Sequence, residues 1–137
     1  MTMEDISKDR RTDAPALGRR LSYRISRLHA RLNAQAARIL QDKAGISLSQ
    51  WRTLVMVDSF EEISASEIVK ETKMDKGMIS RAIKTLSELG YIRVDVSEND
   101  HRKHRIRLTK AGRECFDLAW PHMMERQQGI ISQLSHV

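Results

Sequence analysis

The chain of 137 residues contains few of the residue types on which several protein classes depend. Its single cysteine, Cys115, excludes an internal disulfide and fits a reducing, cytoplasmic compartment. No apolar run is long enough to span a membrane, and residues 1–20 lack the apolar core of a secretory signal. With two Phe and two Tyr, the sequence offers no aromatic platform for stacking RNA bases. We therefore expect a cytoplasmic protein with no membrane segment.

Catalytic and metal-binding motifs are absent as well. The sequence has no nucleophile elbow, no glycine-rich phosphate loop and no metal triad. His101 and His104 are spaced i, i+3, but a zinc site requires three or four ligands, and no cysteine or further histidine lies close to them in sequence. We expect a protein that is not an enzyme and that needs no metal or cofactor.

Positive charge, by contrast, is plentiful and segregated. The net charge is +6 and the pI is about 9.8. Residues 17–40 carry six Arg and no acid, and residues 70–113 carry twelve Lys or Arg against six Asp or Glu. Scattered Lys and Arg would give the same net charge without this segregation. Two basic regions in an otherwise acidic chain predict a polyanionic partner, and double-stranded DNA is the first candidate.

Helical periodicity dominates the chain. Residues 1–15 are polar and are expected to form a flexible tail. Residues 16–45 predict a helix that ends at Gly45. Its apolar residues recur every three or four positions in a narrow seam, which is typical of a helix that packs on another helix. From this seam we take three dimerisation candidates: Leu17, Leu21 and Leu28.

Residues 46–112 carry the signals of a helix-turn-helix followed by a hairpin. Ser47 with Gln50 and Ser64 with Glu67 have the spacing of capping boxes, and Asp75 is placed to cap a longer helix that stops before Gly90. A short capped helix, a tight connection and a longer second helix are the pattern of a helix-turn-helix.

The second helix of this pair has one apolar and one polar face. Its polar face combines short and cationic side chains near the N-terminus, as a helix that enters the major groove requires. The residues that we predict to contact DNA are Lys76, Gly77, Ser80, Arg81 and Lys84. The alternative is an ordinary solvated face, and for Gly77 an indifferent position in the first helical turn.

After Gly90 the period of the apolar residues falls from 3.6 to 2, which predicts a two-stranded hairpin. Its tip is strongly cationic, and an arginine at such a tip suits a narrow minor groove. We expect Arg102 to enter the groove, oriented by Asp100, while Lys103, His104 and Arg105 lie near phosphates. The alternative for Asp100 and Arg102 is a surface ion pair of little energetic value.

The last segment, residues 113–137, predicts a helix with an apolar stripe and an internal Pro121. The stripe supplies five further dimerisation candidates: Phe116, Trp120, Met123, Ile130 and Leu134. Trp51, Trp120, Met123 and Met124 could instead line a cleft for a small aromatic effector, although Met and Trp at helical spacing are more often core residues. An alternative function is that of a ligand or thiol sensor that acts through Cys115, which is more simply a small buried apolar residue.

Residues 64–112 together resemble the winged helix-turn-helix core of the MarR (multiple antibiotic resistance regulator) family. The likeness lies in Ser80-Arg81, the exit "LSELGYIRV", Asp100-x-Arg102, Leu108-Thr109 and Gly112, in this order. It implies a mostly α fold with a small β-hairpin wing and long N- and C-terminal dimerisation helices. It further implies a homodimeric transcription regulator, usually a repressor, that binds a pseudo-palindromic operator and is released by a small aromatic or lipophilic effector.

Overall fold

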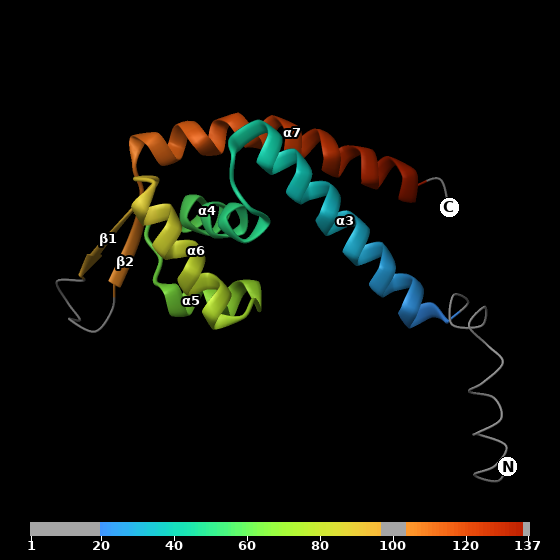
Figure 1. Ribbon diagram of the computed structural model, residues 1–137, viewed down its shortest axis with the longest axis horizontal. Coiled ribbons are helices and arrows are strands. Elements are labelled where there is room, and N and C mark those ends of the chain that lie inside the picture. Colours follow the sequence, from blue (N-terminus) through green and yellow to red (C-terminus); the bar gives the residue numbers. More distant parts are fainter. Residues whose placement is uncertain (1–19, 97–103, 136–137) are drawn as a thin grey trace, which may run out of the picture. The chain divides into compact units, whose positions relative to one another are not determined.

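The structure, a computed structural model, describes residues 20–96 and 104–135 (Figure 1). It divides the chain into two compact units, residues 1–35 and 36–137. Five helices and one hairpin are described: α3 (Leu21–Ala44), α4 (Leu48–Phe60), α5 (Ala65–Thr72), α6 (Lys76–Glu88), β1 (Ile92–Val96), β2 (His104–Leu108) and α7 (Lys110–Leu134). The helix α3 begins in the first unit and ends in the second, to which all later elements belong. The predicted fold class, mostly helical with a small hairpin, is confirmed.

Side-chain caps fix the starts of the three central helices. Ser47 Oγ accepts a hydrogen bond from the Gln50 N–H, and the Gln50 side chain accepts one from the Ser47 N–H. Ser64 and Glu67 repeat this reciprocal pair at α5. At α6, Asp75 Oδ2 accepts from the Met78 N–H at 3.0 Å. All three predicted caps are therefore confirmed, and each satisfies a backbone donor that the helix cannot.

The turn between α5 and α6 is short because Lys73 adopts a left-handed conformation, with φ of 57°. The helices α4, α5 and α6 then pack together in the second unit, beside the hairpin (Figure 1). Their inward side chains form one core with the base of the hairpin and α7, and the fully buried members include Leu54, Ile68, Ile79, Leu86 and Ile106.

The hairpin pairs antiparallel, with Val94 opposite Ile106 and Val96 opposite His104. The predicted alternation is present, but its apolar face is covered only near the base. Ile92 and Ile106 are buried, whereas Val96 is 53% exposed. Ile92 lies at the end of β1 that follows α6, which packs against this strand, whereas Val96 lies at its far end, toward the hairpin tip.

A third extended segment, missed in the sequence, flanks β2. Ile63 and Ile106 form an isolated antiparallel bridge, in which each backbone N–H donates to the carbonyl of the other residue. This bridge brings the residues just before α5 onto the free edge of β2. It also fixes the hairpin to the helical body through backbone hydrogen bonds, independently of side-chain packing.

The start of α7 lies against the backbone that precedes the hairpin. Thr109 Oγ1 accepts from the Gly112 N–H and donates to the Gly90 carbonyl, while the Thr109 N–H donates to the Tyr91 carbonyl. A Cβ atom at Gly112 would lie 1.8 Å from the Tyr91 carbonyl oxygen. Only glycine fits at this contact, which explains its place in the first turn of α7.

Candidate nucleic-acid interface

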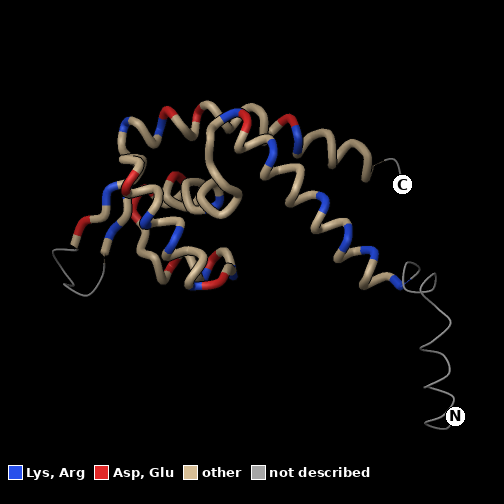
Figure 2. The backbone as a smooth tube through the Cα atoms, viewed as in Figure 1, with Lys and Arg blue, Asp and Glu red and all other residues tan. Residues whose placement is uncertain are grey.

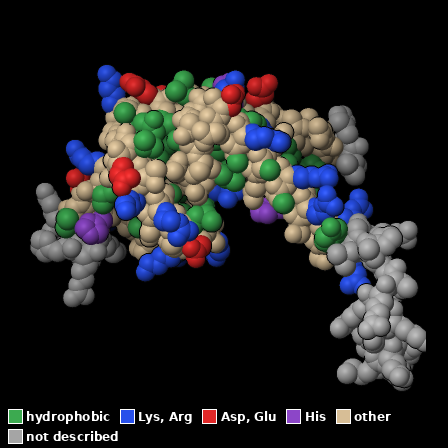
Figure 3. All heavy atoms as spheres, viewed as in Figure 1, with side chains coloured by type: hydrophobic (Ala, Val, Ile, Leu, Met, Phe, Trp, Pro, Cys, Tyr) green, Lys and Arg blue, Asp and Glu red, His purple; other side chains and the backbone are tan. Residues whose placement is uncertain are grey.

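The helix α6 separates its buried and exposed side chains cleanly. Ile79, Ala82 and Leu86 are buried in the core. The opposite face exposes four of the five residues predicted to contact DNA, namely Lys76, Ser80, Arg81 and Lys84, and the fifth, Gly77, is half-buried. Figure 3 shows Lys and Arg side chains gathered over α5 and α6. The free backbone N–H groups in the first turn of α6 point away from the helix. The N-terminus of α6 therefore favours an anion.

Gly77 has a definite packing role in that first turn. A Cβ atom at this position would lie 3.0 Å from Asp75 Oδ2 and 3.2 Å from Arg81 Nη1. The guanidinium of Arg81 therefore folds back over the turn, beside the carboxylate that caps the helix. Glycine leaves room for this guanidinium, and both neighbouring atoms are ends of flexible side chains.

The predicted contacts in the hairpin fall into two groups. Asp100, Arg102 and Lys103 lie outside the described residues. His104 is exposed at the start of β2. Arg105 lies beside two acidic side chains: its Nε atom lies 3.4 Å from Glu62 Oε1, and its Nη1 atom lies 3.6 Å from Glu67 Oε2. Within its own chain Arg105 thus pairs with two carboxylates, and its contact with phosphate stays a prediction.

Glu62, which the sequence reasoning missed, is the centre of this charged group. Its Oε2 atom accepts a hydrogen bond from Arg107 Nη2 at 2.7 Å, in addition to the contact with Arg105. The Ile63–Ile106 bridge explains the geometry, because antiparallel pairing places Glu62 directly across from Arg107. Arg105 and Arg107, two residues apart, share one face of β2. This repeat was the only sequence signal that an acidic partner was required.

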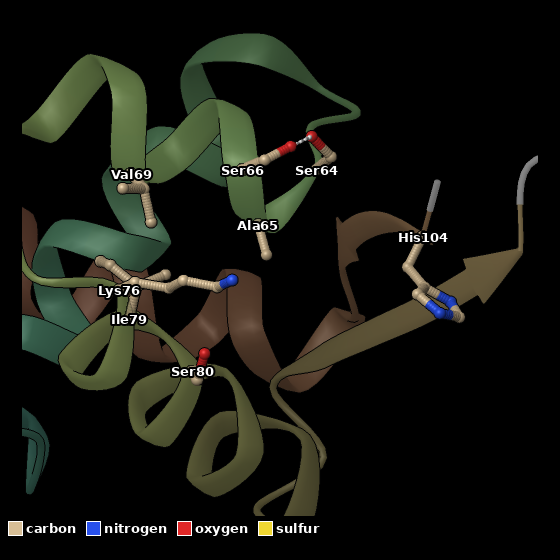
Figure 4. A pocket seen from close by; sticks show the side chains of 8 residues that line it. All are labelled: Ser64, Ala65, Ser66, Val69, Lys76, Ile79, Ser80 and His104. Carbon is tan, nitrogen blue, oxygen red and sulfur yellow. Dashed lines mark hydrogen bonds between the residues drawn. The ribbon is translucent and has the colours of Figure 1, made fainter. Parts of the chain in front are cut away.

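A pocket of about 530 Å³ lies between α5, α6 and the start of β2 (Figure 4). Lys76 and Ser80 of α6 point into it from one side, and His104 of β2 faces it from the other. Ser64 and Ser66, whose hydroxyl groups lie 3.1 Å apart, close it near the start of α5. The pocket thus joins the exposed face of α6 to the hairpin, and Lys76 supplies the positive charge among its lining residues.

Comparison with known proteins agrees with this geometry. Residues 44–103 match the model of the MarR family. We call residues 44–103 the MarR-family segment. Over 73 residues, the chain is 33% identical to an uncharacterized HTH-type transcriptional regulator, YdgJ, of Bacillus subtilis (strain 168), and the match covers 53% of the chain but only 44% of that relative.

Solved structures extend the likeness beyond the MarR-family segment. A MarR/EmrR family transcriptional regulator from Acinetobacter sp. ADP1 is 28% identical and superposes with a TM-score of 0.76, over 85% of this chain and 82% of the other. A mutant of MarR from E. coli, complexed with operator DNA, is 20% identical with a TM-score of 0.67, over 88% and 93% of the two chains. This second likeness shows the fold alone.

The dimerisation candidates lie mostly outside the MarR-family segment, and the structure separates them by burial. Phe116 and Met123 lie in the core of their own chain, and Phe116 stacks on Trp51 at 5.0 Å between ring centroids. These two are corrected to core residues, because buried side chains cannot form a free surface. Among the others, Leu21, Leu28, Trp120 and Leu134 are exposed, Ile130 is half-buried, and Leu17 lies outside the described residues.

The features behind the alternative functions are buried or absent in the described part of the chain. Cys115 is buried, and this burial raises the pKa of its thiol, which lowers its reactivity. Trp51 and Met123 belong to the core, and neither lines the pocket between α5, α6 and β2. Within residues 20–96 and 104–135, no three metal-ligating side chains cluster, and no helix is long and apolar enough to cross a membrane.

Proposed function

We propose that this chain is a sequence-specific regulator of transcription that binds double-stranded DNA through α6 and the hairpin. The observation that carries the proposal is the exposed face of α6, where Lys76, Ser80, Arg81 and Lys84 stand opposite a fully buried apolar face. A helix so divided can enter the major groove without loss of its own packing. The MarR-family match and the similarity to transcriptional regulators support the same assignment.

Each part of this interface has a distinct physical task. Ser80 is small enough to let the backbone approach base edges, and Arg81 can donate two hydrogen bonds to a guanine. Lys76 and Lys84 suit phosphates, which fix position without reading sequence. The hairpin tip, with Arg102 oriented by Asp100 and with Lys103 beside it, is assigned to the adjoining minor groove or its phosphate edge. His104 lies near phosphates in this arrangement.

We further propose that the regulator acts as a homodimer on a pseudo-palindromic operator. We also propose that it represses transcription, as is usual in the family that it resembles. The exposed apolar side chains of Leu21 and Leu28 on α3, and of Trp120 and Leu134 on α7, support a second copy as partner. In this proposal residues 16–45 and 113–137 form the dimerisation helices, and residues 46–112 form the DNA-binding domain. Half-sites about one helical turn apart would match two-fold docking.

The test is DNA binding by the full chain at two salt concentrations. Duplexes selected from a random pool would first define the operator and the spacing of its half-sites. Gel shifts should then show steep weakening with salt, and a double variant, Arg81→Ala with Arg102→Ala, should bind far more weakly while it remains folded. Undiminished binding by this folded double variant would remove the assignment of the contacts.

The pocket supports a second element of the proposal, control by a small aromatic acid. Its volume lies within the range of ligand sites, and Lys76 with His104 offers a carboxylate two cationic or hydrogen-bonding partners. A ligand there would occupy the face of α6 that we assign to DNA, and so would compete with the operator. Thermal-shift measurements with aromatic acids, on the wild type and on Lys76→Ala, test this; equal shifts in both proteins would place the ligand elsewhere.

A further inference from the structure

Four arginines at the start of α3 and in its N-terminal half share one face of the helix. Arg20, Arg24, Arg27 and Arg31 follow one another at steps of four, three and four residues. At about 100° per residue they lie within about 60° of one another around the helix axis. We call this group the arginine stripe. Figure 2 shows the repeated basic residues along α3, with no acidic residue until its last turns.

The arginine stripe is exposed and lacks acidic neighbours on its helix. All four residues are exposed, and the first acid of α3 is Asp42, near its C-terminus. None of the ion pairs formed among the described residues includes a member of the stripe. The one aromatic contact is that of the Arg27 guanidinium, which lies 5.9 Å from the ring centroid of Tyr23. Among the described residues, no carboxylate therefore neutralises the charge of the stripe.

This arrangement opposes the stability of the helix itself. Like charges four residues apart, as at Arg20 and Arg24 or at Arg27 and Arg31, repel one another. The N-terminal end of a helix also favours acidic side chains, and the first turn of α3 contains none. A helix face that only contacts solvent can carry acidic and basic side chains together equally well. A stripe of a single sign, placed where it destabilises the free helix, indicates an anionic partner.

The stripe is distinct from the apolar seam that we assign to the dimer. Leu21, Ile25 and Leu28 are exposed on a face about 100° away around the axis. A helix that covers the seam would therefore leave the stripe open. The arginines and the apolar residues can thus serve two different partners at the same time.

We propose that the arginine stripe binds the phosphate backbone of duplex DNA, in addition to the binding by α6 and the hairpin. The inference rests on the proposed function. The stripe extends for about 16 Å, over which one strand of B-DNA presents about five phosphates. Arginine is the side chain best suited to this binding, because its planar guanidinium can hold two phosphate oxygens at once.

The experiment compares two triple variants of the full chain, one that removes the positive charge and one that keeps it. In the first, Arg24, Arg27 and Arg31 become Gln; in the matched control, the same three become Lys. Binding of a fluorescein-labelled duplex of mixed sequence is measured by anisotropy between about 50 and 200 mM KCl. The Gln variant should reduce the slope of log K against log salt by about 0.9 for each phosphate that it no longer neutralises, and the Lys variant should keep the slope. Across this fourfold salt range, each such phosphate makes the change in affinity about 3.5-fold smaller.

The remaining outcomes separate this inference from the proposed function. The Gln variant should melt at or above the wild-type temperature, because repulsion is removed, so weaker binding would not reflect unfolding. A slope equal to that of the wild type overturns the inference, and leaves the proposed function standing if Arg81→Ala still weakens binding. A lower oligomeric mass of the Gln variant in light scattering would assign the stripe to a second copy and also overturn it. A wild type that binds no duplex at the lowest salt would end both proposals.

Discussion

Substitution of Gly112 by alanine tests the close approach of α7 to the backbone of Tyr91. The added Cβ atom would lie 1.8 Å from the carbonyl oxygen of Tyr91, whereas real contacts begin near 3.0 Å. The obstacle is a backbone atom and cannot rotate away. Tyr91 is also held on both sides, since its N–H donates to the Leu86 carbonyl at 2.9 Å and its carbonyl accepts from the Thr109 N–H at 3.1 Å. Relief of the clash must therefore move the junction between α6, the hairpin and α7.

The magnitude follows from three terms. Overpacking of a well-filled site costs about 1–3 kcal/mol. Displacement of the Tyr91 carbonyl weakens a backbone hydrogen bond worth about 1 kcal/mol. Against these, replacement of a helical glycine by alanine gains at most about 1 kcal/mol, and less in a first turn. We expect a net loss of about 2–3 kcal/mol in the free energy of unfolding, which lowers the melting temperature by roughly 10 °C.

The same helix supplies a matched control. At Gly129, also within α7, an added Cβ atom would meet nothing within 4 Å. Gly129→Ala should therefore leave stability unchanged or raise it by up to about 1 kcal/mol. Urea unfolding followed by circular dichroism, at one protein concentration, measures both variants. If the two substitutions proved equally tolerated, the contact between Gly112 and Tyr91 would not constrain the fold as described.

Three further substitutions address the ion pairs of the hairpin, the cap of α6 and the thiol of Cys115. Glu62→Gln should steepen the salt dependence of DNA binding, because it removes the carboxylate that neutralises Arg105 and Arg107, with little change in far-UV circular dichroism; a salt slope equal to that of the wild type would contradict this. Asp75→Ala should cost about 1 kcal/mol of stability through loss of the α6 cap, as measured by urea unfolding. Because burial raises the pKa of the Cys115 thiol, the unfolded thiol ionises first, so stability should fall as pH rises above the ordinary value of 9.0. A Cys115→Ser variant that showed the same alkaline loss would exclude the thiol as its source.

The sequence predicts this fold well where the signal is local. The caps at Ser47, Ser64 and Asp75 each depend on residues three positions apart, and all three are present. The alternation in the hairpin likewise needs only neighbours along the chain. The resemblance to the MarR family then connects these pieces in the correct order, which local patterns alone cannot do.

Prediction was weaker where residues far apart in the chain determine the outcome. Glu62 and Arg107 lie 45 positions apart and meet because Ile63 pairs with Ile106. No periodicity in the sequence predicts that bridge, so Glu62 was missed as the acidic partner of Arg105 and Arg107. Phe116 was misplaced for a related reason: an apolar stripe on a helix shows that a face is covered, but not whether its own chain or a second copy covers it.

Ion pairs within the chain reduce the net positive charge that the strands of the hairpin can offer to DNA. Arg93 pairs with Asp95 at 2.8 Å, and Arg105 and Arg107 pair with Glu62 and, for Arg105, Glu67 as well. The described strands are thus largely neutralised by their own chain, although the sequence presents them as a basic region. Since only cations that displace counterions contribute to salt dependence, the twelve Lys and Arg of residues 70–113 overstate the footprint on DNA. Any steep salt dependence must then come from α6, from the hairpin tip and from surfaces such as the arginine stripe, whose charges have no carboxylate partner among the described residues.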